Sequence, residues 1–413
     1  MTTRPSTSIG EIVDKSQVNS YKKSKFHDIR HYGLMWPLFP PQNHIDVEVE
    51  IHESAVLAKK LGVKQVYICH EGSMANPSGS MKDYLVRQGT VLAKEQGARG
   101  VHCSSSGNHG LSAAIFGQEA DLKGIVFVPD SASSIKLDLL CSFPNLFVVA
   151  FRDVIVDDVF RFAYSLEIPS FYNVNASNDE LITGLYPIGR AVSKLAVEPT
   201  HVVVGVGNGT YLAGIGYALE QHQINSKIVG VGMRGAFPME TALAKNQLIY
   251  EQETFLTDLS IIDRAESAIP LESYSMPALI HILKRSNGFT LNDLVNADLA
   301  AAYHLLYEDK NLIKQGVIPE PTGILGLAAG LKYRESFTPD DVLLFSFTAS
   351  GIKDKHGICA LVPDIGPTLV QQCEMARPDL DVKNRKPAHT PFVIDKPASP
   401  RDLLALLTEH YNG

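Results

Sequence analysis

Short apolar runs alternate with stretches of helical periodicity from about Gln65 to Phe347, and this alternation restricts the possible folds more than any other feature. The runs are Val66–Cys69, Gly100–Cys103, Gly124–Val128, Leu146–Phe151, Val202–Gly205, Ile228–Met233 and Val342–Phe347. Several are apolar throughout, as in strands of a parallel sheet that helices cover on both faces. Helical patterns between them include Lys82–Gly97, Asn296–Asp309 and Thr322–Tyr333. The sequence therefore predicts an α/β architecture with mostly parallel, twisted sheets flanked by helices.

Length and charge narrow the class of protein further. A chain of 413 residues is too long for one ordinary hydrophobic core and predicts two or three packed domains. Its 37 Lys and Arg against 45 Asp and Glu, a net charge of -8, argue against general binding to nucleic acid or to anionic membranes. No run approaches the roughly 18 apolar residues of a membrane-spanning helix, and no secretory signal is visible. We expect a cytoplasmic enzyme with no nucleic-acid or membrane partner.

A turn-rich loop, Asn76-Pro-Ser-Gly-Ser-Met-Lys82-Asp83, leads directly into the first helical pattern. Lys82 would lie at or near the helix N-terminus, where the positive end of the helix dipole lowers the pKa of an ammonium group. A lysine that is partly neutral near pH 7 can act as a Schiff-base nucleophile or as a general base. Taken alone, the position also suits an ordinary solvated lysine.

A second loop, Ser104-Ser-Ser-Gly-Asn-His-Gly110, follows the predicted strand that ends at Cys103. Its hydroxyl groups, its glycine-freed backbone and the helix start behind it suit the binding of a carboxylate. The same residues are also typical of an ordinary strand-to-helix turn with Ser and Asn as caps.

A third loop, Val204-Gly-Val-Gly-Asn-Gly-Thr210, lies between the strand Val202–Gly205 and a helical pattern at Tyr211–Glu220. Small residues let backbone N–H groups surround a phosphate, and Thr210 adds a hydroxyl group. A dinucleotide-binding fingerprint is disfavoured, because Thr210 occupies its last glycine position and Arg234, not an acid, follows the next strand.

A fourth segment, Phe347-Thr-Ala-Ser-Gly-Ile-Lys-Asp354, ends the last strong strand. It places hydroxyl residues at the carboxyl edge of a sheet, where α/β proteins bind ligands. The alternative is again a helix cap and a turn.

In order and spacing, the four segments resemble those of the fold type II pyridoxal-phosphate family, the tryptophan synthase β-like enzymes. They look most like its threonine synthase and cysteate synthase-like branch, over roughly Ile51–Asp354. The matched family motifs are the lysine loop N-P-T-G-S-F-K-D at Asn76–Asp83, the carboxylate loop S/T-x-G-N at Ser105–His109, the glycine-rich phosphate loop at Val206–Thr210, the T-G-H-G-L-K-D segment at Thr348–Asp354 and the E-P-x-x segment at Glu320–Gly323.

The resemblance implies a role for each matching residue. Lys82 would hold pyridoxal phosphate as a Schiff base and later remove the Cα proton of the substrate. The implied cofactor contacts are Asn108 for the ring hydroxyl, Val206, Gly207, Asn208, Gly209 and Thr210 for the phosphate, and Thr348 or, second, Ser350 for the pyridine nitrogen. The implied substrate contacts are Ser105, Ser106 and His109 for the carboxylate, with Asn175 and Ser177 lining the pocket.

The implied reaction is elimination or replacement at the β or γ carbon of an activated amino acid. A hydroxyl partner leaves the pyridine nitrogen largely unprotonated, which favours this chemistry over transamination. Candidate substrates are O-phosphoserine, O-acetylserine and a homoserine ester. One alternative is a serine/threonine dehydratase or a diaminopropionate ammonia-lyase, which Gly107-Asn-His109 favours. The alternative of another class is a non-catalytic pyridoxal-phosphate carrier or sensor.

The sequence differs from the threonine synthase motif at the position that binds the phosphate of the substrate. Aligned on Gly184, Leu181 stands where their motif N-x-x-N-P-x-R-x-E-G-Q-K-T has the arginine that binds the substrate phosphate. Loss of a bidentate phosphate ligand argues against phosphohomoserine as the substrate.

The resemblance also implies two α/β domains with the cofactor in the cleft between them, and a homodimer. We expect a large cofactor-binding domain at 46–90 and 190–370 and a small mobile domain at 91–189. Residues 1–45 would form an N-terminal extension, and residues 371–413 a tail with a terminal helix that begins near Ser399-Pro400.

No metal site is predicted. His27 and His31 have the spacing of two ligands on one helix face, but no third ligand lies near them in the sequence, which favours surface histidines. The tetrad Ser133-Ser-Ile-Lys136 resembles a penicillin-binding serine motif, but the companion motifs S-D-N and K-T-G are missing.

Overall fold

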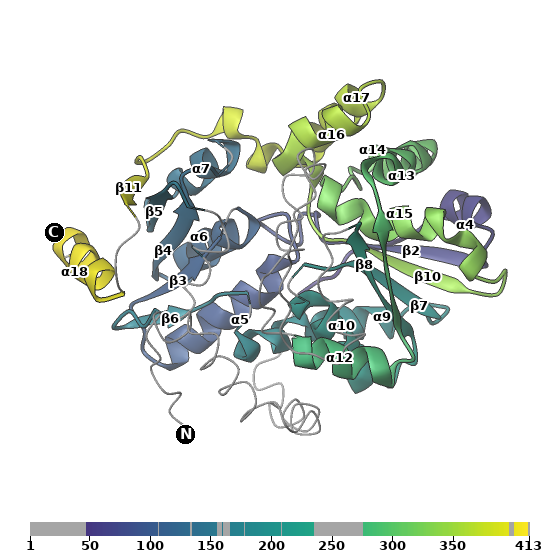
Figure 1. Cartoon of the computed structure of the whole chain (residues 1–413), viewed down its shortest axis with the longest axis horizontal. Coiled ribbons are helices and arrows are strands. Elements are labelled where there is room, and N and C mark those ends of the chain that lie inside the picture. Colours follow the sequence, from purple (N-terminus) through teal and green to yellow (C-terminus); the bar gives the residue numbers. More distant parts are fainter. Residues whose placement is uncertain are drawn as a thin grey trace. The chain divides into compact units, whose positions relative to one another are not determined.

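The computed structural model describes residues 47–105, 107–132, 134–154, 159, 166–176, 178–207, 209–234, 276–395 and 400–411. The expected N-terminal extension, with His27 and His31, lies outside these residues. The chain divides into two compact units, each drawn in Figure 1. Within the described residues, the first unit holds 86–178 and 385–411, and the second unit holds 47–85 and 179–384.

The second unit is built on a six-stranded sheet. Its strand order is β1 (Ile51–Glu53), β2 (Gln65–His70), β10 (Val342–Phe347), β7 (His201–Gly205), β8 (Lys227–Met233) and β9 (Phe289–Leu294). All neighbours are parallel except β1 and β2. The inner strands are almost wholly buried, because helices cover both faces.

Helices of the second unit form a layer on each side of this sheet (Figure 1). One layer contains α9 (Tyr186–Val192), α10 (Thr210–Gln221) and α12 (Met276–Arg285). The other contains α4 (Ala55–Leu61), α13 (Asn296–Glu308), α14 (Lys310–Lys314) and α15 (Leu325–Lys332). Further helical segments are η2 (Asp179–Leu185), η5 (Pro321–Ile324), η6 (Arg334–Ser336), η7 (Gly351–Asp354), α16 (Lys355–Leu361), α17 (Gly366–Ala376), η8 (Pro378–Leu380) and η9 (Val382–Asn384).

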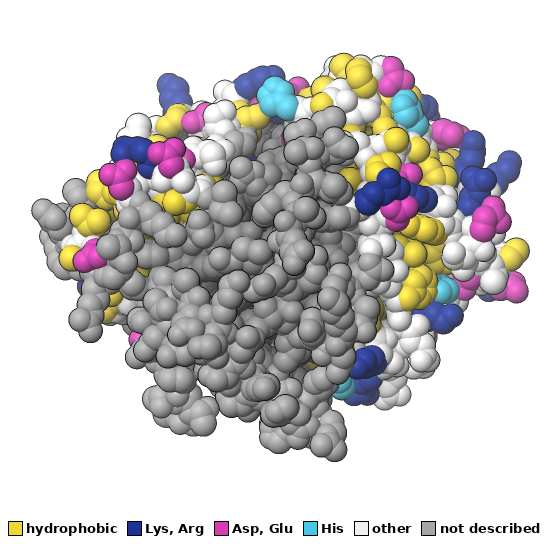
Figure 2. Space-filling model, viewed as in Figure 1, with side chains coloured by type: hydrophobic (Ala, Val, Ile, Leu, Met, Phe, Trp, Pro, Cys, Tyr) yellow, Lys and Arg dark blue, Asp and Glu magenta, His cyan; other side chains and the backbone are white. Residues whose placement is uncertain are grey.

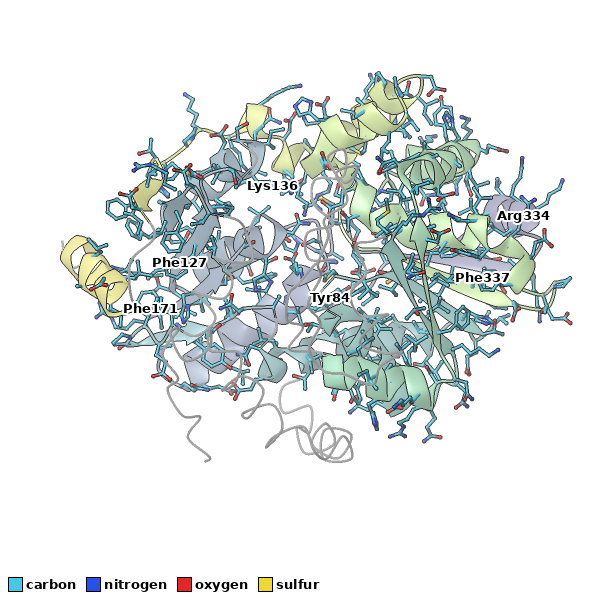
Figure 3. The ribbon with its side chains drawn as sticks, viewed as in Figure 1. Tyr84, Phe127, Lys136, Phe171, Arg334 and Phe337 are labelled. Atoms are coloured by element: carbon cyan, nitrogen blue, oxygen red, sulfur yellow. The ribbon has the colours of Figure 1, made fainter. Side chains whose placement is uncertain are left out.

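The first unit contains a five-stranded sheet that is parallel throughout. Its strand order is β11 (Phe392–Asp395), β5 (Leu146–Arg152), β4 (Lys123–Pro129), β3 (Gly100–Ser104) and β6 (Phe171–Asn173). Its helices are most of α5 (Lys82–Glu95), α6 (Asn108–Glu119), α7 (Ser134–Cys141) and α18 (Pro400–Tyr411). Phe127 on β4 and Phe171 on β6 are labelled in Figure 3.

The C-terminal residues fold back onto the sheet of the first unit. Strand β11 pairs in parallel with β5, and Leu403 and Leu407 of α18 enter the core that also contains Phe127 and Phe151. The helix predicted near Ser399-Pro400 is confirmed and begins at Pro400. The end of the chain therefore supplies both an edge strand and core side chains.

All seven predicted strands are confirmed, and the α/β class with mostly parallel sheets is confirmed with them. The four strands that the sequence did not reveal, β1, β6, β9 and β11, are the four sheet edges. Edge strands are partly exposed on at least one side, so these four lack the fully apolar pattern of the inner strands.

The described surface carries both signs of charge. Figure 2 shows Lys and Arg side chains interspersed with Asp and Glu on the face that it draws. Among the described helices, none has the length and apolar character needed to cross a membrane.

Candidate active site

The lysine loop lies against the carboxyl end of β10. The N–H of Met81 donates to the carbonyl of Thr348 at 2.9 Å, and the N–H of Ser350 donates to the carbonyl of Gly79 at 2.9 Å. Ser80 and Ala349 form an antiparallel bridge between these two contacts. Two of the four segments singled out in the sequence therefore meet at the sheet edge where parallel α/β sheets bind ligands.

Lys82 is the first residue of α5, as the sequence predicts. The pKa of its ammonium group is lowered from 10.5 to about 8, chiefly because burial removes water from the charged form, while the carboxylate of Glu320 opposes this shift. The direction agrees with the prediction from the helix dipole, but burial is the larger cause. An amine with this pKa is partly neutral near physiological pH and is able to act as a nucleophile.

The charge of Glu320 gives a direct test of this electrostatic account. Glu320→Gln is expected to lower the pKa of Lys82 below about 8, because the carboxylate favours the protonated amine. The pH dependence of Lys82 acylation in the cofactor-free protein, read by peptide mass spectrometry, measures the shift. Glu335→Gln is the control, since that side chain is 91% exposed. An unchanged or raised midpoint in Glu320→Gln would contradict the account.

Two buried cations hold the backbone of the lysine loop. Lys353 donates from Nζ to the carbonyls of Ser78 and Gly79 at 2.8 and 2.9 Å. The guanidinium of Arg377, directly after α17, donates to the carbonyls of Gly72, Ser73, Asn76 and Pro77 at 2.7 to 3.2 Å. Arg377 is only 2% exposed. Because one planar group satisfies four carbonyls, it fixes the conformation of the loop that carries Lys82.

The glycine-rich loop connects β7 to α10. Gly209 precedes the helix with a φ of 87°, a left-handed conformation that favours glycine. The N–H of Val206 donates to the carbonyl of Val231 at 2.8 Å, so this backbone group is already used within the sheet. The loop therefore offers a phosphate the N–H groups of Gly207 and Gly209 and the start of α10, where the helix dipole favours an anion. Asn208 lies outside the described residues.

A buried carboxylate that the sequence analysis missed connects this loop to the lysine loop. Glu71 accepts from the hydroxyl of Tyr211 at 2.6 Å and from the amide of Asn76 at 2.9 Å. Tyr211 lies in the first turn of α10, and its hydroxyl is also 2.8 Å from that of Ser346 on β10. Burial raises the pKa of Glu71. The available signal was an acidic residue directly after a strand whose centre, Val66–Cys69, is apolar, a position where a charge needs buried partners.

Tyr211→Phe is expected to lower the free energy of unfolding by about 1–3 kcal/mol, because Glu71 and Ser346 then lose a buried hydrogen-bond partner. Urea unfolding followed by circular dichroism measures the change. Tyr307→Phe, at a half-buried tyrosine, is the matched control. Equal stability of Tyr211→Phe and the wild type would show that the network contributes nothing measurable.

Thr348 and Ser350, the two candidate partners of the pyridine nitrogen, differ in whether their hydroxyl group already makes a hydrogen bond. The hydroxyl of Ser350 accepts from the N–H of Ile352 at 3.5 Å and thereby caps the segment Gly351–Asp354. The hydroxyl of Thr348 has no hydrogen-bond partner within the part of the chain that the structure describes, although the residue is buried. Thr348 is therefore the better candidate to donate to a bound ligand.

The carboxylate loop belongs to the first unit, between β3 and α6. The hydroxyl of Ser105 accepts from the N–H groups of Gly107 and Gly110 at 3.0 and 2.8 Å, so it acts as a cap. His109 is buried, and its Nε2 contacts the carbonyl of Val174. Asn108 is the first residue of α6. Lys136, labelled in Figure 3, lies so close to Gly107 that a Cβ there would meet its side chain at 2.5 Å.

Asn175, just after β6, forms hydrogen bonds with Ser104 at the start of this loop. Its Oδ1 accepts from the N–H and the hydroxyl of Ser104 at 2.8 and 3.0 Å, and its Nδ2 donates to Asn173 at 2.7 Å. With the side chain fully buried and its amide engaged, Asn175 positions the end of β3. Ser106 and Ser177 lie outside the described residues.

Comparisons with known proteins bear on the family and on the fold of this chain. The model of the pyridoxal-phosphate dependent enzyme family matches residues 48–349. The chain is 26% identical over 332 residues to threonine synthase of Halalkalibacterium halodurans, covering 78% of this chain and 86% of that protein. It is 26% identical over 252 residues to the biosynthetic L-threonine dehydratase of Haemophilus influenzae, covering 59% of this chain and 44% of that protein. A fungal L-serine ammonia-lyase from Rhizomucor miehei shares the fold, with a TM-score of 0.61 and 16% identity over 74% of this chain and 94% of that one.

Proposed function

Because the chain belongs to the pyridoxal-phosphate dependent enzyme family, we propose that it catalyses elimination or replacement at the β or γ carbon of an activated amino acid. It is a pyridoxal-phosphate dependent enzyme of the threonine synthase and threonine dehydratase type. The proposed substrates are O-phosphoserine, O-acetylserine or a homoserine ester.

The residues of the second unit fit pyridoxal phosphate chemically. Lys82 would hold the cofactor covalently, because the pKa of its amine is lowered to about 8. Gly207, Gly209 and Thr210 would bind the phosphate, since the two glycines carry no side chain and the loop leads into a helix N-terminus. When bound, the cofactor supplies an electron sink for the bonds around the substrate Cα.

The hydroxyl of Thr348, which has no hydrogen-bond partner among the described residues, is the observation that carries the proposed reaction type. It lies in the segment that pairs with the lysine loop and is the proposed donor to the pyridine nitrogen. A neutral hydroxyl does not hold a proton on that nitrogen as a carboxylate does. This favours loss of a side-chain substituent over transamination.

Residues of the carboxylate loop are proposed to bind the substrate through backbone N–H groups more than through side chains. The hydroxyl of Ser105 and the Nε2 of His109 already make contacts within the first unit. Helix α6 begins at Asn108, and the dipole of a helix favours an anion at its N-terminus. Such a helix start suits a carboxylate.

The surroundings of Leu181 support a substrate other than phosphohomoserine. This residue is 0% exposed within η2, so its position offers an apolar side chain buried in the core. A buried leucine cannot replace the two parallel hydrogen bonds of an arginine to a phosphate.

A product screen tests the proposal. The holoenzyme is incubated with O-phosphoserine, O-acetylserine, O-phosphohomoserine, serine and threonine, and the release of phosphate, acetate, keto acid and threonine is measured. Turnover of O-phosphoserine or O-acetylserine, with a sulfur or amine nucleophile or with water, supports the proposal. Formation of threonine from phosphohomoserine would contradict the argument from Leu181. No turnover of any amino acid by a fully loaded protein would favour a carrier or sensor.

A dehydratase is the second candidate, since a threonine dehydratase is among the similar proteins and an L-serine ammonia-lyase shares the fold. It predicts keto acid from unactivated serine or threonine, with no dependence on a leaving group such as phosphate.

The proposed homodimer and the proposed large and small domains are separate expectations. Light scattering tests the homodimer, and limited proteolysis tests the domains.

A further inference from the structure

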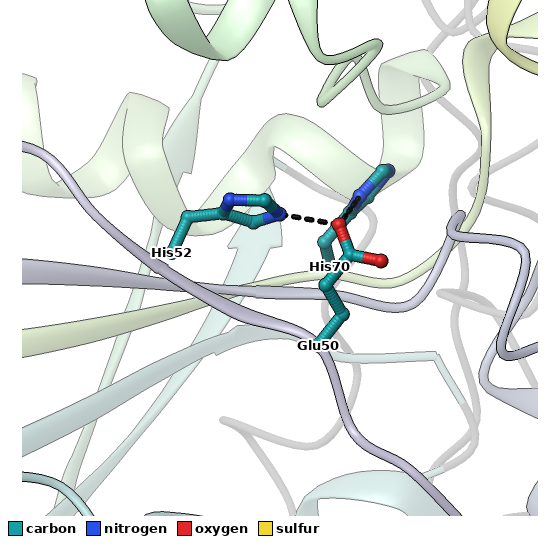
Figure 4. A group of neighbouring side chains, drawn as sticks. All are labelled: Glu50, His52 and His70. Carbon is teal, nitrogen blue, oxygen red and sulfur yellow. Dashed lines mark hydrogen bonds and ion pairs between the residues drawn. The ribbon is translucent and has the colours of Figure 1, made fainter.

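Three side chains outside the lysine loop form a compact set of metal-binding groups. They are Glu50, just before β1, His52 on β1 and His70 at the end of β2 (Figure 4). One ligand atom from each lies within 4.8 Å of the other two. The carboxylate oxygen Oε1 of Glu50 is 2.5 Å from Nε2 of His52 and 3.4 Å from Nδ1 of His70.

The strand register creates this set. His52 pairs with Ile68 and Ile51 with Cys69 across the antiparallel edge of the sheet, and the N–H of His70 donates to the carbonyl of Glu50 at 2.9 Å. Glu50 and His70 are therefore opposite each other. Because alternate residues of a strand point to the same face, His52 shares that face with Glu50. The backbone thus fixes three ligand side chains on one side of two paired strands.

The chemistry of the set matches a divalent transition metal. Two imidazoles and one carboxylate are preferred ligands of Zn²⁺, at bond lengths of about 2.0–2.2 Å, which places the ligand atoms about 3.3 Å apart around a tetrahedral ion. The 3.4 Å between Oε1 of Glu50 and Nδ1 of His70 is near this value, whereas the 2.5 Å between Oε1 of Glu50 and Nε2 of His52 is shorter, so these two atoms would move apart to bind one ion.

The degree of exposure also suits a metal that keeps one position for water. The side chain of His70 is 5% exposed, that of His52 16% and that of Glu50 39%, so the set is open on one side. The buried Nε2 of His70 has no hydrogen-bond partner within the described residues. The ring nitrogen of His70 that faces Glu50 is Nδ1, so Nδ1 is the atom that would bind the ion.

We propose that Glu50, His52 and His70 bind one divalent transition-metal ion of the zinc class at the edge of the second unit's sheet. The ion would link β1 to β2 through its bonds to these side chains, and it would stabilise the start of the lysine loop. His70 directly precedes Glu71, whose carboxylate holds Asn76 of that loop. The site is separate from the proposed cofactor contacts, because none of its three ligands belongs to the four segments that resemble the family.

Calorimetric titration of the chelator-treated holoenzyme with Zn²⁺ tests the proposal. The wild type is expected to bind one ion at this site with a rise in the unfolding temperature. His52→Ala, and the more conservative His52→Gln, are expected to weaken this binding at least about tenfold. Circular dichroism and the visible cofactor band confirm that each variant is folded and loaded.

His304→Ala is the matched control, since that histidine is 48% exposed and faces a single carboxylate, that of Asp364. A second control, the double variant His27→Ala/His31→Ala, tests the other histidine pair of the sequence. Both controls are expected to bind Zn²⁺ as the wild type does. Binding that is absent in the wild type, unchanged in both His52 variants, or lost in the His27/His31 variant would overturn the proposal.

Anomalous scattering from crystals grown with Zn²⁺ provides a readout that does not depend on activity. The proposal requires a peak within coordination distance of Glu50, His52 and His70. Since neither experiment follows turnover, failure of the metal site leaves the proposed reaction untouched, and failure of the reaction leaves the metal site untouched.

Discussion

Lys82→Ala is expected to lower kcat by about 10³-fold or more for the substrate that the product screen identifies, because it removes the group proposed to bind the cofactor and to move the Cα proton. The effect should be large because the structure concentrates several features on this one amine. Lys82 is the first residue of α5, and it directly follows the segment Gly79–Met81, whose backbone pairs with Thr348–Ser350. Burial lowers the pKa of its amine to about 8. Steady-state kinetics with saturating pyridoxal phosphate measures the loss.

Lys94→Ala provides the matched control for this experiment. Lys94 is an exposed lysine in the last turn of the same helix, so its loss changes the net charge equally. Its activity is expected to stay within about twofold of the wild type, as for most surface substitutions. If Lys82→Ala were as active as Lys94→Ala, Lys82 would not be part of the chemistry.

Arg377→Met is expected to produce the largest loss of stability, about 3–5 kcal/mol in the free energy of unfolding. Methionine keeps much of the apolar stem but leaves the buried carbonyls of Gly72, Ser73, Asn76 and Pro77 without their donor. The lysine loop should shift as a result, and a displacement of about 1 Å at a reacting group is able to reduce activity about 100-fold. Denaturant unfolding and the cofactor content of the purified protein measure the two effects.

The comparison with Arg334→Met separates loop support from loss of a positive charge. Arg334, labelled in Figure 3, is 55% exposed and pairs with the neighbouring Glu335. Its removal is expected to change the free energy of unfolding by less than about 0.5 kcal/mol. Arg377→Lys should fall between the two variants, because a single ammonium group cannot reach four carbonyls in a plane. Equal stability of Arg377→Met and Arg334→Met would refute the assigned role.

The sequence predicted the inner strands well because their burial leaves a direct mark in the composition. β2, β4, β7 and β10 are buried along almost their whole length and read as continuous apolar runs. The edges β1, β6, β9 and β11 carry mixed patterns and depend on their neighbours for definition. Sequence periodicity could not predict where β11 lies, because its pairing with β5 joins residues more than 200 positions apart.

The same distinction holds for the candidate site. Lys82 and the glycine-rich loop were predicted because their local spacing is itself the signal. Arg377 was not, since it contacts carbonyls about 300 residues away and nothing near it in the sequence marks that role. The set of Glu50, His52 and His70 arises from an antiparallel register, which brings His70 to two residues that lie 18 and 20 positions before it in the sequence. Long-range contacts of this kind follow from the fold alone.

Trapping the cofactor on its lysine tests the central claim most directly. The holoenzyme is reduced with borohydride, digested and mapped by mass spectrometry, so that the residue carrying the pyridoxyl group is identified. The account predicts the label on Lys82 and on no other lysine. Lys136 and Lys353 are the two lysines of the described chain with at most 9% of their surface exposed. A label on either of them, or an unlabelled Lys82 in a protein that contains the cofactor, would contradict the account.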